Sequence, residues 1–199
     1  MISHIVFTRM NFENLELLNK YLLVTKSILL PSLKSQTERN FTWVILINRE
    51  HEEYLKKELN FPFKAIYGNS GYVEYVMSTK PNIQTRHDCD DYMSASYIEK
   101  IQSLYRENIN RHKCLIIHAQ PTLLNYETCT EKSLPKYHDK RCSMFLSLCQ
   151  STFKHHVNER KHGQMYEITN NIILLPEGYC KWVIHGNNKS LKKQKPYGK

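Results

Sequence analysis

The chain has 199 residues, a length that suits one domain with a substantial buried core. Hydrophobic residues make up 41% of it and charged residues 24%, with six glycines and seven prolines, which excludes a collagen-like or a disordered chain. The formal net charge of +9 favours an anionic partner: a phosphorylated ligand, a nucleic acid or an acidic membrane surface.

The chain begins with alternating strand and helix patterns. A short buried strand is predicted at 4–7 and a helical stripe of leucines over 15–29, which Pro31 ends or restarts. The apolar run at 41–47 is too continuous for a strand with one wet face. It therefore predicts a parallel strand buried on both faces.

The same alternation continues up to the middle of the chain. A short amphipathic helix is predicted at 51–60 and a third strand at 63–67, followed by a flexible loop at 68–71. The segment 82–87 is extended, and the apolar spacing over 94–109 predicts a helix. This order predicts an α/β fold with a Rossmann-like, mainly parallel sheet.

The second half of the chain contains strand patterns without long helices between them, which predicts a mixed or antiparallel continuation of the sheet. These patterns lie at 114–118, 122–126, 144–148 and 165–175.

The two ends of the chain and its cysteines indicate where in the cell the protein is expected. No signal peptide is visible at the start, and the longest apolar runs are far too short to cross a membrane. The six cysteines are irregularly spaced, which fits a reducing cytoplasm. Six lysines and no acidic residue fall within 178–199, so this end is either a solvated tail or a weak electrostatic contact with an anionic membrane.

A cluster of carboxylates follows the extended segment and precedes the helix. Asp88, Asp90 and Asp91 lie within four positions of a basic protein. Ligands of parallel α/β sheets gather at the carboxyl ends of the strands, and hard divalent cations prefer oxygen ligands. The cluster therefore indicates a Mg²⁺ or Mn²⁺ site, with an acidic turn that caps the following helix as the alternative.

Four segments resemble rhamnosyltransferases of the GT-A type. Residues 85–91 are similar to the signature T-R-x-D-x-D-D, and residues 4–11 are similar to the first strand of the family with its T-R-x-N ending. Residues 30–43 resemble an L-P-S-L-x-x-Q-T…F-x-W block, and residues 182–188 resemble a W-x-x-H-x-x-N block. Because the four occur in order from residue 4 to residue 188, they are more specific together than any one alone.

The resemblance implies a GT-A fold and a glycosyltransferase, and it assigns roles to the acidic cluster. Asp90 would coordinate Mn²⁺ or Mg²⁺ directly, while Asp88 would contact the ribose or reach the metal through water. Asp91 would orient the donor sugar. His185 would complete the metal site, the alternative being an ordinary histidine at the end of a strand.

Further residues are implied to bind the nucleotide. Thr8 and Arg9 end the first strand, where the nucleotide would lie, and Arg9 would pair with phosphate. Arg86 would either do the same or pair with a neighbouring aspartate. Asn48 ends the second strand, at a position where GT-A enzymes often place an aspartate that contacts the base.

An inverting transfer needs a base to accept the proton of the acceptor hydroxyl. We take His156 as this base, within a polar stretch that also contains His155 and Glu159. The alternative for all three is a solvent-exposed loop.

The sequence thus predicts a single domain over 1–188, with a nucleotide-sugar-binding half at 1–93, an acceptor half at 94–188, and a flexible tail at 189–199. The donor would be a UDP-, GDP- or dTDP-sugar and the acceptor a saccharide or a lipid-linked molecule. No nucleic-acid motif is present. A metal-dependent nuclease and a GT-A-like domain that only binds a saccharide or a protein remain as alternatives. A zinc protein is disfavoured, because the spacings of the cysteines and histidines within 142–162 match no structural zinc pattern.

Overall fold

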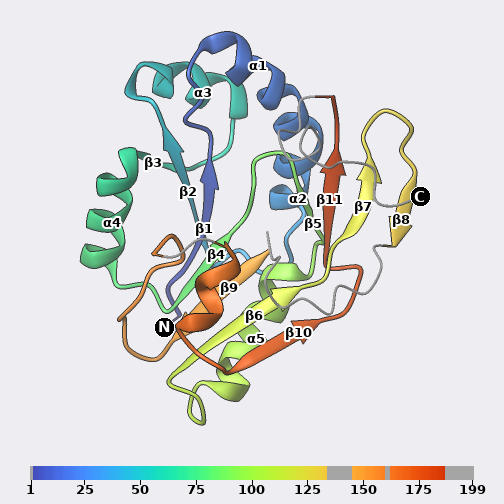
Figure 1. Ribbon diagram of the computed structural model, residues 1–199. Helices are drawn as coiled ribbons and strands as arrows, with labels where there is room; N and C mark the ends of the chain where they lie inside the picture. The colour runs from blue at the N-terminus through green and yellow to red at the C-terminus, as the bar shows by residue number, and fades with distance from the viewer. Residues whose placement is uncertain (1, 134–144, 160–161, 187–199) are drawn as a thin grey trace.

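The structure is a computed structural model that describes residues 2–133, 145–159 and 162–186. Two β-sheets form its framework (Figure 1). The larger sheet consists of β1 (His4–Arg9), β2 (Thr42–Ile47), β3 (Lys64–Tyr67), β4 (Ile83–Arg86), β6 (Cys114–Ala119), β9 (Leu146–Gln150) and β10 (Ile172–Leu175). The smaller sheet consists of β5 (Tyr92–Met93), β7 (Thr122–Asn125), β8 (Glu131–Ser133) and β11 (Cys180–Ile184).

The larger sheet has the strand order β10-β6-β9-β4-β1-β2-β3. Strands β4, β1, β2 and β3 are mutually parallel, so their carboxyl ends meet at one edge. Strand β9 runs antiparallel between β4 and β6. The predicted mainly parallel sheet with a mixed continuation is therefore confirmed.

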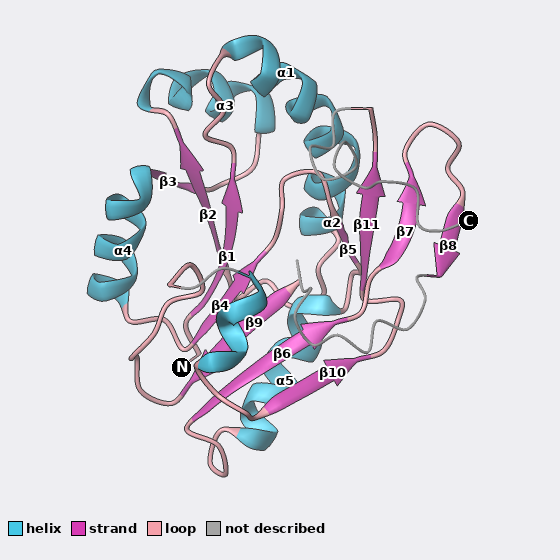
Figure 2. Cartoon of the chain, viewed as in Figure 1, coloured by secondary structure: helices cyan, strands magenta, loops and turns pink. Residues whose placement is uncertain are grey.

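Helices and shorter helical turns connect the strands (Figure 2). These are α1 (Leu15–Val24), α2 (Leu30–Lys34), α3 (Glu52–Leu59), α4 (Gly68–Thr79) and α5 (Tyr97–Asn108), with a π-helical turn η1 (Thr25–Leu29) and two 3-10 turns, η2 (Arg49–His51) and η3 (His162–Glu167). The helix expected over 15–29 thus contains the π-helical turn η1, and Pro31 does not end it, because the helical chain continues through α2.

Apolar side chains cover both faces of the larger sheet. In β1, Val6 belongs to the cluster that contains Leu18 and Ile101, whereas Phe7 belongs to the cluster that contains Tyr72 on the other side. This double burial explains why the strands read as continuous apolar runs instead of alternating with polar residues.

The flexible loop predicted at 68–71 is wrong, because these residues form the first turn of α4. Two glycines made a helix unfavourable by propensity. However, Tyr72 is 1% exposed, and its ring lies 4.2 Å from that of Phe7, so packing on the sheet outweighs the local preference. Gly68 has φ of +68°, a value that an L side chain rarely adopts, and it begins the helix directly after β3.

No helix in the described part of the chain is long and apolar enough to cross a membrane. The described cysteines are free thiols. The tail expected at 189–199 lies outside the described residues.

Candidate functional site

The acidic loop, residues 88–91, follows β4 at the carboxyl edge of the larger sheet. The backbone N–H of His87 donates to the carbonyl of Phe7 in β1 at 2.9 Å, so the chain stays attached to the parallel strands up to the start of the loop. Immediately afterwards β5 pairs with β11 in the smaller sheet. The loop thus lies where the two sheets meet, at the edge that binds ligands in such folds.

Asp90 and His185 are in contact, although 95 positions separate them in the sequence. His185 Nε2 lies 2.8 Å from Asp90 Oδ2, and the two residues are 5% and 9% exposed. His185 follows the end of β11, and β11 is fixed on both sides by β5 and β7. The smaller sheet therefore brings a distant histidine onto the acidic loop.

Asp91 points into the protein and is 1% exposed. Its Oδ1 accepts a hydrogen bond of 2.9 Å from the backbone N–H of Val183 in β11. Burial raises the pKa of the Asp91 carboxyl well above its usual range, and the charges of Asp90 and Asp88 add to the shift. The carboxyl that the family resemblance assigns to the donor sugar thus accepts a hydrogen bond from a strand of the protein.

Arginines lie on the same edge as the acidic loop. Arg86 ends β4, and its side chain points to the same face of the sheet as that of the exposed Arg9 at the end of β1. Burial lowers the pKa of Arg86, the partly buried Asp88 opposes this shift, and Arg9 adds to it. Within the described residues the buried Nε of Arg86 has no hydrogen-bond partner. Two neighbouring guanidinium groups, one with an unused donor, suit a phosphate.

Thr8 and Asn48 make contacts within the protein. Thr8 is fully buried, and its hydroxyl accepts a hydrogen bond of 3.0 Å from the indole N–H of Trp43. Asn48 Nδ2 donates to the carbonyl of Phe12 at 2.7 Å, which ties the end of β2 to the segment after β1. A nucleotide contact by the Thr8 side chain stays a prediction that its burial disfavours, whereas the half-buried Asn48 lies at the expected edge.

His156 packs on the face of the larger sheet that carries Phe7, the face to which Arg86 also points. Its ring packs edge-on against Tyr72 with centroids 5.9 Å apart, and burial lowers its pKa. The neighbouring carbonyl, that of His155, accepts a hydrogen bond from the side chain of Gln84, which is four positions before Asp88. Four residues of extended chain span about 13 Å, so this contact is far from the acidic loop along β4. The role of His156 as the base stays a prediction.

A divalent metal would find part of its ligand set here. Ligand atoms about 2.1 Å from Mg²⁺ at right angles are about 3.0 Å apart, which is close to the 2.8 Å between Asp90 Oδ2 and His185 Nε2. Among the described residues, however, no group of three His, Cys, Asp or Glu side chains could hold a metal ion. Of the expected set, Asp90 and His185 are brought together and Asp88 does not complete a third position. Such a pair fits a metal that takes its remaining ligands from substrate phosphate and water.

Tyr21 and Thr25 belong to the site although no sequence motif marks them. The ring of Tyr21 lies edge-on to that of His185 with centroids 5.4 Å apart. Burial raises the pKa of Tyr21 to about 12, with further contributions from Asp90, Cys89 and Asp88. The Thr25 hydroxyl donates to the carbonyl of Cys89 at 2.8 Å. In the sequence both residues look like ordinary positions of an amphipathic helix.

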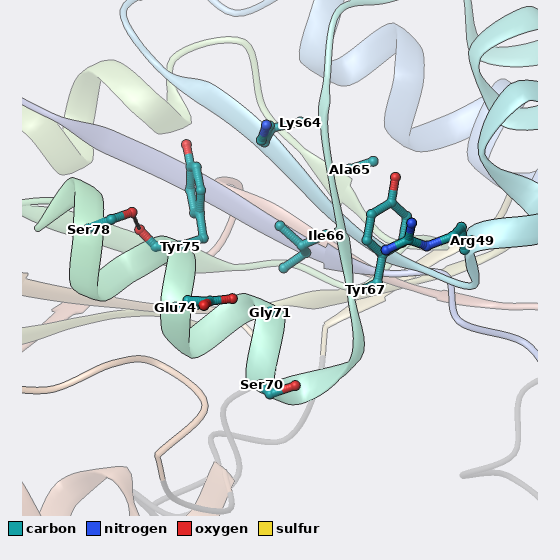
Figure 3. Close-up of a pocket in the computed structure, with 10 residues that line it drawn as sticks. All are labelled: Arg49, Lys64, Ala65, Ile66, Tyr67, Ser70, Gly71, Glu74, Tyr75 and Ser78. Atoms are coloured by element: carbon teal, nitrogen blue, oxygen red, sulfur yellow. Dashed lines mark hydrogen bonds between the residues drawn. The ribbon is translucent and has the colours of Figure 1, made fainter.

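A pocket of about 440 Å³ lies elsewhere, between β3 and α4 (Figure 3). Arg49 stands at one end with its guanidinium carbon 4.5 Å from the centre of the Tyr67 ring, and Glu74 lines the helix side. None of the predicted site residues lines it, so the site rests on the acidic loop and not on this pocket.

Comparison with protein-family models and with curated proteins finds no match. Solved structures do match. The structure of S. aureus TarS residues 1–349 in complex with UDP-GlcNAc has a TM-score of 0.56 and 12% identity, covering 98% of this chain and 62% of that one. A structure of S. aureus TarS has a TM-score of 0.52 and 11% identity, covering 92% of this chain and 37% of that one.

GalNAc-T7 with UDP, GalNAc and Mn²⁺ has a TM-score of 0.54 and 10% identity, covering 92% of this chain and 44% of that one. Identities this low show a shared fold alone. The GT-A-type fold is therefore confirmed. The chain spans between 37% and 62% of the length of these structures.

Proposed function

We propose that this chain is a metal-dependent glycosyltransferase domain that moves a sugar from a nucleotide-sugar to a saccharide or another hydroxyl acceptor. The observation that carries the proposal is the 2.8 Å contact between Asp90 and His185 at the carboxyl edge of the sheet. The proteins of the same fold support it, because their structures contain UDP-GlcNAc, or UDP with GalNAc and Mn²⁺.

Asp90 and His185 would hold the ion, Mn²⁺ or Mg²⁺, and Asp88 would reach it through water or contact the ribose. The metal would neutralise the departing diphosphate as a Lewis acid. Arg86 and Arg9 would bind phosphate oxygens, since both side chains lie on one face at the ends of adjacent strands. Inversion at the sugar and a rhamnosyl donor rest on family resemblance only.

A thermal unfolding assay tests the proposal. UDP-, GDP- and dTDP-sugars are added with and without Mn²⁺, and one nucleotide is expected to stabilise the protein only with the metal. A ligand at 100 times its Kd adds about 2.7 kcal/mol. For a chain of this size each kcal/mol raises Tm by about 2–4 °C.

Asp90→Ala is expected to abolish the metal-dependent shift. Glu16→Ala is the matched control, because Glu16 is a carboxylate on the surface of α1 that pairs with Lys20. An Asp90→Ala protein that responds like wild type would show that the site is elsewhere. A nucleotide shift without sugar turnover would favour a binding domain. Salt-sensitive DNA binding without any nucleotide shift would favour the nuclease.

A further inference from the structure

Strands β5 and β11 pair only briefly beside the acidic loop. Cys180 is paired with Met93, and Lys181 with Tyr92, in an antiparallel register. If the same register continued, Trp182 would face Asp91 and Val183 would face Asp90. The backbone ladder stops before that point, because the chain turns: the N–H of Asp91 donates to the carbonyl of Asp88 at 3.3 Å.

The side chain of Asp91 takes the place of the next backbone acceptor. Its Oδ1 receives the N–H of Val183 at 2.9 Å, and Val183 is itself fully buried. Asp91 is thus an acceptor for a buried N–H, and the loss of an acceptor by a buried donor is unfavourable. The other side of β11 is already occupied by its pairing with β7.

This hydrogen bond is made by a residue of β11 that lies two positions before His185, which follows directly after the strand. It joins Asp91, the neighbour of Asp90, to Val183. The two contacts, Asp91 with Val183 and Asp90 with His185, therefore hold one loop against one strand. At 1% exposure Asp91 has almost no surface with which to contact a sugar.

We propose that Asp91 is a positioning residue that fixes β11 on the acidic loop and so sets His185 against Asp90. Its function is that of a hydrogen-bond acceptor, and its charge is not required. The consequence for catalysis rests on the proposed function, whereas the positioning itself does not. Asparagine has an oxygen in the same place as the carboxylate and lacks the charge, so two substitutions separate the roles.

The test compares Asp91→Asn with Asp91→Ala in the full chain. Hydrogen exchange of the Val183 amide and the NMR resonance of the His185 ring report the positioning, and the amide of Val44 in the core reports global unfolding. In Asp91→Ala we expect Val183 to exchange about tenfold faster or more relative to Val44, and the His185 resonance to move. In Asp91→Asn both signals are expected to stay near wild type.

Mn²⁺ affinity and donor turnover provide the second readout. Loss of a residue that orients a metal ligand commonly lowers metal affinity or activity by about 10–100-fold. We expect such a loss in Asp91→Ala and a smaller loss in Asp91→Asn, because asparagine keeps the oxygen that accepts from Val183.

The outcomes separate the two ideas. An Asp91→Asn protein that keeps Val183 protected but is as inactive as Asp90→Ala would overturn the proposal, because the charge would then act on the donor. Unchanged Val183 protection in Asp91→Ala would overturn it as well. If no variant and no wild-type protein binds a nucleotide, the proposed function fails, yet the exchange data still decide the positioning. If Asp91→Ala does not fold, Asp91→Asn alone decides the question. Loss of protection of the Val183 amide in Asp91→Asn would refute the proposal that an uncharged oxygen at this position is enough to accept the hydrogen bond.

Discussion

The hydroxyl of Thr25 links the π-helical turn η1 to the acidic loop. Thr25 is fully buried, and its hydroxyl donates to the carbonyl of Cys89 at 2.8 Å; the carbonyl of Tyr21 lies 2.9 Å away as a second acceptor. Thr25→Val keeps the shape and the β-branch of the side chain and removes only this donor. It therefore tests whether the helix end holds the loop.

The expected loss of stability depends on which carbonyl acceptors lose a hydrogen-bond donor. The Tyr21 carbonyl keeps the backbone N–H of Thr25, whereas Thr25 supplies the side-chain donor to Cys89. One buried carbonyl is left without that donor, so we expect a loss of about 1–3 kcal/mol in the free energy of unfolding. For a chain of this size Tm should fall by about 2–4 °C for each kcal/mol.

Urea unfolding followed by far-UV circular dichroism measures this difference. Thr79→Val is the matched control, because the Thr79 hydroxyl bonds to the carbonyl of Tyr75 four residues earlier, on the exposed surface of α4. Its effect should stay within about 0.5 kcal/mol. Equal stabilities of the two variants would refute the reasoning that η1 anchors the acidic loop.

Two further predictions concern buried polar groups. Thr8→Val should lower the free energy of unfolding by about 1–3 kcal/mol because the indole N–H of Trp43 loses its acceptor. The affinity for the nucleotide-sugar, measured by calorimetry, should stay within about twofold of wild type. A large loss of this affinity at unchanged stability would instead show that the hydroxyl contacts the ligand. Burial lowers the pKa of His4 to about 3 and that of His87 to about 4, so the unfolded state binds protons first and stability should fall from about pH 6.5 downwards by about 1.4 kcal/mol per unit for each histidine. Urea unfolding between pH 7 and pH 5 should show a shallower loss in His87→Phe, and a stability that does not change with pH would contradict the assignment.

Much of the first half of the fold could be predicted because its strands are buried on both faces and therefore appear as apolar runs. The run at 41–47 corresponds to β2 and the extended segment at 82–87 to β4. Helix α4 could not be predicted, since its glycines argue against a helix and its stability comes from contact with Phe7 and the sheet. Strand β5, with only two residues, exists because β11 pairs with it.

The site was predictable in part for a similar reason. Spacing alone placed Asp88, Asp90 and Asp91 near the carboxyl end of a strand, but it could not distinguish a side chain that faces a ligand from one that faces β11. His185 came from the family resemblance, because nothing local joins it to a loop 95 positions earlier. His156 followed from its residue type within a polar stretch; its ring packs against Tyr72, and its role as the base stays a prediction.

Contacts from separate parts of the chain hold the acidic loop. Thr25 binds the carbonyl of Cys89, Asp91 receives the N–H of Val183, and the N–H of His87 is bound by β1. The carboxylate of Asp90 is itself in contact with His185, whose Nε2 lies 2.8 Å from Asp90 Oδ2. A flexible acidic turn that only caps a helix would need no such restraint, and its carboxylates would face water. The burial of Asp90 and Asp91 therefore argues that the loop is held in place before any ligand binds, as the proposed site for a metal and a diphosphate would need.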